Sequence, residues 1–509
     1  MKRRENRSIA ARLVSIAAAV GLGAACGSEN SENPDPGSGA SAGTGAVAGI
    51  AGTGSGGAGT GGAGAGTTSV GGATAGGAGA GGAGVAGGGT AGTGATAGAA
   101  GTVAGSGSAG DAGTSGSAGA GGSAGASGGA AGTGGGTGGN HPFPVNTRSE
   151  RCTYPTNANP EHARAAYEAW KTNIVTADGA RGFLRTRRPN SPGAEVNSTV
   201  SEGIAYGMIL AVVMSDQPTF DALWLYSQQF LNENGLMHWY INAAGTSVLG
   251  SGGATDSDED IAWALILADR QWGGSGTIGE PYIDAAKRQI QAVWDHEIDH
   301  SRNGFLLPGD TWGGNVTFNP SYFAPNEYRM FGEVSGNVEG WNQVIDTGYT
   351  MLETCLNEAN GNEENGLAPA WCSPEGVPGD PPHYQYDSAR VPFRIGQDYC
   401  YSGEPRAAAY LAKISTFFAN IGAANIVDGY DLNGTPHPDA DSDPNGPQSA
   451  VFVGSAAVGA MHDPAFQTFV DEAYALVATG ELLARSTYYN HSWTGLTLLM
   501  LTGNLVEWQ

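Results

Sequence analysis

The sequence predicts an all-helical fold, a closed array or toroid of helices, in the part of the chain from residue 141 to residue 509. Three observations support this prediction. Apolar residues recur at helical spacing in many segments, strand-like alternation is scarce, and no heptad repeat is sustained long enough for a coiled coil. Loops rich in Gly, Pro and Asn separate the helical segments, so we expect functional side chains in loops at helix ends.

Seven segments carry the helical pattern. In SEGIAYGMILAVVM, Ile204, Met208 and Val212 share one face, and in DEDIAWALILADRQW so do Ile261 and Leu265. We expect these faces to pack inward. The segments are PEHARAAYEAWKTNIV, SEGIAYGMILAVVM, DEDIAWALILADRQW, AAKRQIQAVWDHEI, ARVPFRIGQDYCYSG, PRAAAYLAKISTFFA and FQTFVDEAYALVATGELLA.

Residues 1–26 have the pattern of an export signal. A basic start precedes a short apolar stretch, and small residues precede Cys26. The apolar run is short for a membrane span, and the cysteine resembles a bacterial lipoprotein cleavage site. We therefore expect export, a lipid anchor to the membrane through Cys26, and a place in the cell envelope or on the cell surface. An ordinary cleaved signal followed by secretion is the alternative.

Residues 27–140 are predicted to form a disordered linker. From about Asn33 onward this segment consists almost entirely of Gly, Ala, Ser, Thr and Val, so burial cannot offset the entropy of ordering the chain. The composition changes near residue 141, and residues 141–509 are long enough for one large domain with a single core.

Cysteines and charge restrict the environment and the partners. Cys152, Cys355, Cys372 and Cys400 would enter an oxidising compartment, where one or two disulfides form; the sequence leaves all three pairings open. Their spacing contains no CxxC pair that would indicate zinc. A net charge of -25 argues against nucleic acid and anionic lipid as binding partners and favours a neutral or cationic substrate.

The stretch GATDSDEDIAW (residues 253–263) crowds four carboxylates ahead of an apolar run. An EF-hand-like calcium loop fails because Ile261 replaces the required glycine and Leu267 replaces the bidentate glutamate. A second acidic stretch, Asp441 to Gly446, has the turn but Phe452 at the twelfth place. For that stretch a calcium loop and a solvated acidic loop both stay open.

Carboxylates in the first turn of a helix interact favourably with its free N–H groups and its dipole. We assign this role to Glu259 and Asp260 and leave Asp258 unassigned. Asp256 is expected just outside the first turn, where it can point into a cleft. Glu202 is another carboxylate at a predicted helix start, so the two acidic groups can converge on one site.

Converging carboxyls suit the hydrolysis of a glycosidic bond, which needs one protonated acid and one ionised base. Sugar rings also need aromatic faces, and the predicted loops supply many. Of these aromatic residues we expect four to bind substrate: Trp239, Trp371, Tyr386 and Tyr489.

Four ordered motifs resemble glycoside hydrolase family 8, the inverting endoglucanases, xylanases and related enzymes: SEGIAYGM, ATDSDEDIAWALILADRQW, NPSYFAP and YDSARVPFR. A YYNHSWTGLTLLMLTGN segment resembles the last helix of the family. The resemblance implies that Glu202 is the general acid and that Asp256 contacts the sugar at the cleavage point. It places Tyr322 near the nucleophilic water. Asp387 would be the general base of one subfamily, with Arg390 as the partner that orients it.

The resemblance also implies an (α/α)6 barrel with an open substrate cleft at one end, no metal and no cofactor. The implied reaction is single displacement with inversion at the sugar. We expect a monomer that acts on a β-1,4-linked polysaccharide, either glucan or xylan. Chitosan or oligoxylan specificity is an alternative, and so is a surface carbohydrate-binding protein with a decayed site, against which the intact acidic set argues. Asp398 is a fallback base that we expect to be structural.

Overall fold

The structure is a computed structural model that describes residues 139–189, 194–437, 448–479, 482, 487–506 and 508. The predicted export signal with Cys26, the linker up to residue 138 and the acidic stretch Asp441 to Gly446 lie outside the described residues. The described helices are α2 (Pro160–Ile174), α3 (Ser201–Val213), α4 (Gln217–Ser227), α5 (Thr255–Trp272), α6 (Tyr282–His296), α7 (Pro325–Ser335), α8 (Val338–Thr354), α9 (Val391–Ser402), α10 (Pro405–Ile421), α11 (Ala450–Ala460), α12 (Gln467–Ala478) and α13 (Tyr488–Leu501).

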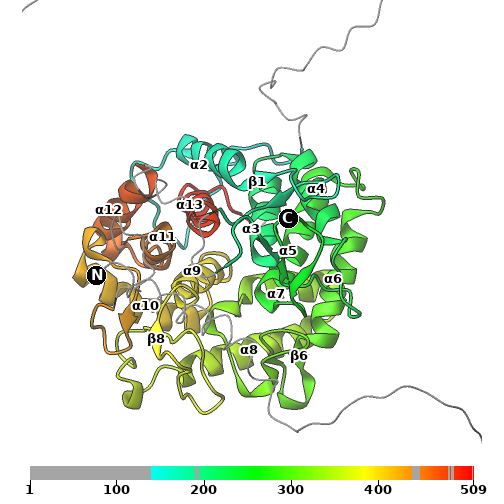
Figure 1. The fold of residues 1–509 in the computed structure, drawn as a ribbon. Helices are drawn as coiled ribbons and strands as arrows, with labels where there is room; N and C mark the ends of the chain where they lie inside the picture. The colour runs from blue at the N-terminus through cyan, green and yellow to red at the C-terminus, as the bar shows by residue number, and fades with distance from the viewer. Residues whose placement is uncertain are drawn as a thin grey trace, which may run out of the picture. The chain divides into compact units, whose positions relative to one another are not determined.

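Two concentric rings of helices form the fold (Figure 1). The inner ring runs through α3, α5, α7, α9, α11 and α13, and it closes because α13 packs against α3. Each inner helix also packs against an outer helix: α4 on α3, α6 on α5, α8 on α7, α10 on α9, α12 on α11 and α2 on α13. This arrangement is the predicted (α/α)6 barrel.

The two rings differ in how they are buried. The outer helix α2 buries one face, with Ala163, Trp170 and Ile174 inward, and Asn159 caps its first turn through an oxygen that accepts from the Glu161 N–H at 3.1 Å. In the inner helices α3 and α11 nearly every residue is buried. The predicted inward face of α3 is buried as expected, and its other faces are buried as well, because the outer ring encloses the helix.

Short antiparallel strands lie in the connections between helices. The pairs are β1 (Val175–Thr176) with β2 (Arg185–Thr186), β3 (Thr199–Val200) with β4 (Tyr240–Ile241), β4 with β5 (Val248–Gly250), β6 (Ile298–Asp299) with β7 (Phe305–Leu306), and β8 (His383–Tyr384) with β9 (Tyr430–Asp431). Two of them lead directly to functional segments. β3 runs into the start of α3, and β8 ends three residues before Asp387.

All seven segments with a helical pattern contain helix, although their ends differ by a few residues. The helices α4, α7, α8 and α11 were missed. α11 reads AVFVGSAAVGA, which is apolar or small on every side and therefore shows no periodicity. The last described helix, α13, was indicated only by the family resemblance.

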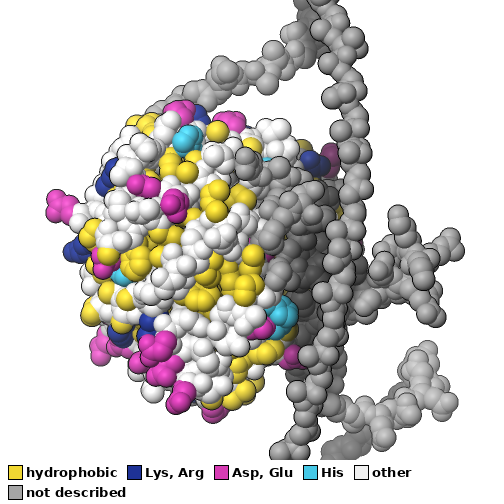
Figure 2. Space-filling view, turned by 90° about the vertical axis from the view of Figure 1, so that its left-hand side faces the viewer, with side chains coloured by type: hydrophobic (Ala, Val, Ile, Leu, Met, Phe, Trp, Pro, Cys, Tyr) yellow, Lys and Arg dark blue, Asp and Glu magenta, His cyan; other side chains and the backbone are white. Residues whose placement is uncertain are grey.

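Two disulfides settle the pairing that the sequence left open: Cys152 joins Cys400, and Cys355 joins Cys372. Figure 2 shows acidic side chains on one face of the molecule singly and in small groups, so the negative charge is spread over that face. Within the described ranges, no helix combines the length and the apolar character that crossing a bilayer requires.

Candidate active site

Segments far apart in the sequence meet where two inner helices begin. Glu202 is the second residue of α3, and Asp256 is the second residue of α5. A short 3-10 turn, η4 (Pro320–Tyr322), packs against a second turn, η6 (Ser388–Arg390), which follows Asp387 directly. The barrel thus brings the four sequence motifs to one place.

Arg390 lies at the centre of this place and is fully buried. Its Nη1 donates to Glu202 Oε2 at 2.5 Å and to Asp256 Oδ2 at 2.7 Å, and its Nη2 donates to Asp387 Oδ1 at 2.8 Å. Ser321 Oγ accepts from Nη2 at 2.7 Å. We call Arg390 with Glu202, Asp256 and Asp387 the open cluster. The predicted role of Arg390 as partner of Asp387 was too narrow, because one guanidinium holds all three carboxylates.

The three carboxylates differ in their access to solvent. The side chain of Asp256 is 4% exposed, whereas that of Glu202 is 19% exposed and that of Asp387 is 31% exposed. Glu202 and Asp387 can therefore meet a bound molecule directly while Asp256 lies deeper.

Burial decides the electrostatics of the open cluster. Loss of water raises the pKa of Asp256 to about 8, with the charges of Glu202 and Asp260 adding to the rise and Arg390 opposing it. Loss of water also raises the pKa of Asp387, again opposed by Arg390 and assisted by Glu202. Carboxyls with raised pKa values beside a fixed cation are suited to proton transfer near neutral pH.

Three tyrosines surround the open cluster. The hydroxyl of Tyr488, the first residue of α13, donates to Glu202 Oε1. The Tyr206 hydroxyl accepts from Arg390 Nη1 at 3.0 Å. The ring of Tyr322 is buried and faces the guanidinium of Arg390, 5.3 Å from its centroid. These contacts fix the orientation of Glu202 and Arg390.

The start of α5 differs from the prediction for the acidic stretch. The helix begins at Thr255, and its N-cap residue Ala254 makes no side-chain cap. Asp256 lies inside the first turn and not outside it, and its Oδ1 accepts from the Ser257 N–H at 2.9 Å. It still reaches the open cluster because its other carboxylate oxygen points to Arg390.

Glu259 and Asp260 do not serve as helix-start carboxylates, so that assignment was wrong. Both are buried at a second arginine, Arg394, whose Nη1 and Nη2 donate to the two oxygens of Asp260 at 2.6 and 3.0 Å. Arg394 Nη1 also donates to Glu327 Oε1 at 2.5 Å, and the Tyr328 hydroxyl donates to Glu259 Oε2 at 2.6 Å. We call Arg394 with Glu259, Asp260 and Glu327 the closed cluster.

Asp258, left unassigned by the sequence, pairs with neither arginine but with residues on the other helices and loops around it. It is fully buried, accepts from the Gln289 amide at 3.2 Å and lies close to the buried carboxyl of Glu297. Burial raises the pKa of Asp258 and of Glu297. The charges of Asp310 and Asp256 add to the rise at Asp258 while a hydrogen bond with Glu297 opposes it, and the charge of Asp258 adds to the rise at Glu297. The four carboxylates of the acidic stretch therefore enter three separate surroundings.

Aromatic rings extend from the open cluster in a row. Trp371 packs edge-on against Tyr322 with centroids 5.9 Å apart, and Trp312 packs edge-on against Trp371 at 6.3 Å. Trp312 is held by its own Nε1, which donates to the Gly253 carbonyl at 2.7 Å. Both tryptophans are half-buried, so part of each ring is available to a ligand.

The other predicted aromatic residues lie in two pairs. Tyr489 donates from its hydroxyl to the Tyr386 carbonyl at 3.1 Å, and the two rings meet edge-on at 6.0 Å. Trp239 stacks on Tyr240 with centroids 5.1 Å apart. Tyr489 also approaches Tyr206 of the site, at 6.3 Å between ring centroids. All four rings are half-buried.

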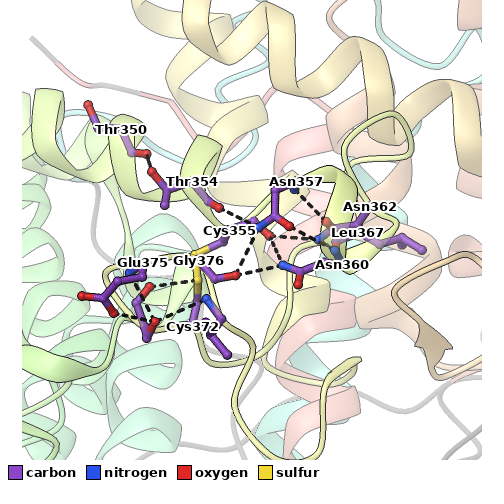
Figure 3. The surroundings of a disulfide bond; sticks show 12 residues. Thr350, Thr354, Cys355, Asn357, Asn360, Asn362, Leu367, Cys372, Glu375 and Gly376 are labelled. Atoms are coloured by element: carbon purple, nitrogen blue, oxygen red, sulfur yellow. Dashed lines mark hydrogen bonds between the residues drawn. A yellow bond between two sulfur atoms is a disulfide. The ribbon is translucent and has the colours of Figure 1, made fainter. Parts of the chain in front are cut away.

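The disulfide between Cys355 and Cys372 holds the loop that carries Trp371 (Figure 3). Cys372 exchanges backbone hydrogen bonds with Phe318 at 2.7 and 2.9 Å, which places Trp371 beside the segment that leads to η4. The Asn362 amide donates to the Cys355 carbonyl at 3.0 Å, and the Asn360 amide donates to the Gly376 carbonyl at 2.9 Å. The loop is thus fixed from both of its ends.

Asp398, the fallback base, is used elsewhere. It is fully buried, accepts from Arg329 Nε at 2.8 Å and from the Tyr349 hydroxyl at 2.5 Å. This network links α9 to α7 and α8, as expected for a structural residue.

The sequence did not single out several residues of the site. Ser321 and Tyr206 carry no signal of their own, because a serine in a loop and a tyrosine in an apolar helix are common. Tyr488 lies beside the predicted Tyr489, and only the helix geometry decides which ring points to Glu202. Trp312 had a usable signal: it is a large aromatic residue in the loop segment GDTWGG.

Comparison with known proteins agrees with this arrangement. The model of the family "Glycosyl hydrolases family 8" matches residues 148–503. The chain is 39% identical over 346 residues to Endoglucanase A of Acetivibrio thermocellus, covering 67% of this chain and 69% of that protein. It is 37% identical over 378 residues to Endoglucanase 2 of Ruminiclostridium josui, covering 71% and 76% of the two chains.

Solved structures show the same fold. The apo structure of a β-1,3-1,4-glucanase from Paenibacillus sp. X4 is similar with a TM-score of 0.63 and 28% identity, covering 72% of this chain and 98% of that one. A cold-adapted family 8 xylanase is similar with a TM-score of 0.57 and 20% identity, covering 71% and 98%. The match of the family model over most of the folded part and the identity to the endoglucanases lead to one conclusion: the chain belongs to glycosyl hydrolases family 8 and is a glycoside hydrolase.

Proposed function

We propose that the protein is an endo-acting hydrolase of β-1,4-linked polysaccharide that works by single displacement with inversion. The observation that carries the proposal is the open cluster, in which Glu202 and Asp387 are partly exposed on different nitrogens of one buried guanidinium. The two carboxyls come from different chain segments, so they can act on opposite faces of a bound sugar, as the acid and the base of an inverting reaction must.

Glu202 is the general acid of this proposal. Its proton passes to the glycosidic oxygen as the bond from that oxygen to the anomeric carbon breaks, so the departing sugar leaves as a neutral alcohol. Tyr488 and Arg390 hold its two oxygens, which fixes the direction in which the carboxyl faces. Asp256 lies deeper and would contact the sugar at the cleavage point.

Asp387 is the general base. It takes a proton from a water molecule as the water oxygen attacks the anomeric carbon from the opposite face, and inversion follows. Room for that water requires the two carboxyls to stand about 6.5–9.5 Å apart in the complex. Arg390 orients Asp387 through Oδ1, and the buried ring of Tyr322 borders the place of the water. We accordingly propose that the chain belongs to the subfamily with an aspartate base, here in the YDSAR segment.

A glucan is the first substrate candidate, because the relatives of highest identity named above are endoglucanases and the solved relative at 28% identity is a β-1,3-1,4-glucanase. Xylan is the second candidate. The half-buried rings of Trp312 and Trp371 beside Tyr322 offer flat apolar surfaces that suit the faces of either sugar.

Hydrolysis of carboxymethylcellulose, lichenan, xylan and chitosan would test the substrate. We expect reducing ends to appear from at least one β-glucan, with an early fall in viscosity that marks internal cleavage. NMR of the first product should show the α-anomer, and Glu202→Gln should be inactive on the same substrate. An initial β-anomer would contradict inversion, and no hydrolysis of any of the four would favour a carbohydrate-binding protein.

Export and anchoring are further parts of the proposal that rest on the sequence of residues 1–26 and on the linker of residues 27–140. A lipid on Cys26 would tether the catalytic domain to the cell envelope. Mass spectrometry of the N-terminal peptide from the native host would test this. A peptide that begins at a diacylated Cys26 supports anchoring, and a cleavage site beyond Cys26 would indicate secretion.

A further inference from the structure

The antiparallel pair of strands β8 and β9, which lie far apart in the sequence, brings two histidines and one aspartate together outside the active site. The antiparallel register pairs His383 of β8 with Asp431 of β9. The chain then turns back, because the Asp431 N–H donates to the Thr435 carbonyl and the His437 N–H donates to the Gly429 carbonyl, both at 2.9 Å. His437 therefore returns to the side of Asp431.

The distances match those between ligands of one metal ion. Nε2 of His383 lies 3.4 Å from Asp431 Oδ1, and Nδ1 of His437 lies 3.0 Å from the same oxygen. Metal–ligand bonds of about 2.0–2.2 Å at tetrahedral angles place any two zinc ligands about 3.3 Å apart. The three ligand atoms all lie within 4.8 Å of one another, and two such bonds span at most about 4.4 Å, so a small adjustment of the side chains would let one ion contact all three.

Ordinary ion pairing explains the trio less well. The rings of His383 and His437 lie 3.9 Å apart between centroids, so two protonated imidazoles would repel each other strongly. One protonated imidazole would pair with Asp431 but would not require the second histidine, and two neutral imidazoles would leave Asp431 without a cation. A divalent ion accepts the lone pairs of both neutral rings and neutralises the carboxylate as well.

We propose that His383, Asp431 and His437 form a binding site for a divalent transition metal ion, with Zn²⁺ as the best fit. Two imidazole nitrogens and one carboxylate oxygen suit zinc, nickel and copper, whereas calcium and magnesium require oxygen ligands. The side chains are 23%, 41% and 49% exposed for His383, Asp431 and His437, so an ion can enter from solvent and keep water as a fourth ligand. The net charge of -25 also favours cations.

The ion would cross-link the pair of strands β8 and β9. It would join β8, β9 and the segment that carries His437. Without the ion, β8 and β9 are held by only two paired residues on each strand. The proposed metal site lies close to the active-site segment in the chain, since Asp387 follows β8 by three residues. The Tyr386 hydroxyl also donates to Asp428, close to β9, at 2.9 Å. The prediction that the family needs no metal concerns the reaction, and the proposed ion lies outside the open cluster.

Titration of the full chain, without an added histidine tag, with ZnCl2 in a calorimeter would test the site. We expect one ion per chain, an affinity reduced at least tenfold in His383→Gln and in His437→Gln, and a similar reduction in Asp431→Asn. His300→Gln is the matched control, because His300 is an exposed histidine of the described chain whose ring pairs with the Trp294 carbonyl. Its affinity should equal that of the unchanged protein.

Thermal unfolding gives a second measurement. Zinc should raise the unfolding midpoint of the unchanged protein and of His300→Gln, EDTA should reverse the rise, and neither should move the midpoint of His437→Gln. Equal zinc affinity in His383→Gln and the unchanged protein would overturn the proposal, as would the absence of saturable binding. Displacement of the zinc by equimolar calcium would overturn the choice of ion.

Discussion

The open and closed clusters are built on the same plan and differ in their access to solvent. Arg390 and Arg394 lie one helical turn apart, and they meet Asp256 and Asp260, which also lie one turn apart on α5. In the closed cluster every side chain is at most 3% exposed, whereas Glu202 and Asp387 of the open cluster are 19% and 31% exposed. The same arrangement of a buried arginine and several carboxylates is therefore structural at Arg394 and a proposed catalytic site at Arg390, one helical turn away.

Charge pairing alone therefore does not mark a catalytic site, since both clusters have it. Breaking a buried ion pair leaves an uncompensated charge, which penalises the fold wherever it occurs. What distinguishes the open cluster is that its acid and base reach solvent and that a row of aromatic rings leads away from it. Variants of matched chemistry in the two clusters can separate these roles.

The largest expected effect is on turnover in the open cluster. Glu202→Gln and Asp387→Asn should each lower kcat by about 10²–10⁴-fold, because each removes one proton-transfer group. The unfolding midpoint in urea should fall less than in the closed cluster, because both side chains are partly exposed and Arg390 keeps its two other carboxylates. Steady-state kinetics on the preferred glucan measure the first effect. A variant with kcat within threefold of the unchanged protein would contradict the assigned role.

The matched substitution in the closed cluster should act on stability. Asp260→Asn breaks the buried two-bond ion pair with Arg394, which keeps Glu327 as its remaining close partner, and should lower the free energy of unfolding by about 3–5 kcal/mol. Urea denaturation followed by circular dichroism measures this loss. The kcat of the folded fraction should stay close to that of the unchanged protein. A large loss of kcat with full stability would mean that the two clusters are not separate in function.

The pH dependence of stability should report Asp256. Its pKa is about 8 in the folded protein and 3.8 as the ordinary value, so the folded state holds an extra proton between these limits. The associated stability is complete below about pH 4 and is lost as the pH rises through about 8. Relative to Asp256→Asn, the unchanged protein should therefore become steadily less stable over this window. Urea denaturation of both proteins at several pH values measures the difference, and an increase with pH would refute the shift.

The smallest expected effects separate two tyrosines that make the same kind of contact. Tyr488 donates to Glu202 in the open cluster, and Tyr328 donates to Glu259 in the closed cluster. Tyr488→Phe should lower kcat about tenfold, whereas Tyr328→Phe should leave kcat unchanged and cost about 1–3 kcal/mol of stability. Kinetics and urea denaturation on both variants provide the check. Equal effects of the two substitutions on kcat would remove the distinction between the clusters.

The sequence alone predicted the fold class and the residues that the structure brings together in the open cluster. Helical periodicity is visible in α2, α6 and α10 because an outer helix has one apolar face and one polar face. Periodicity is lost in α11, which neighbouring helices enclose, so its helix was missed. Glu202, Asp256, Asp387 and Arg390 were found because the family resemblance covers their motifs, although their roles stay proposals.

Only the tertiary structure decided how the acidic stretch is divided. Asp256, Asp258, Glu259 and Asp260 occupy successive positions around one helix, and neighbouring positions on a helix point in different directions. Which of them becomes part of the site depends on the arginines that α9 presents, 134 residues away along the chain. Local sequence carries no information about such a partner, so a helix-start role was assigned to Glu259 and Asp260 where the barrel uses them to bind Arg394.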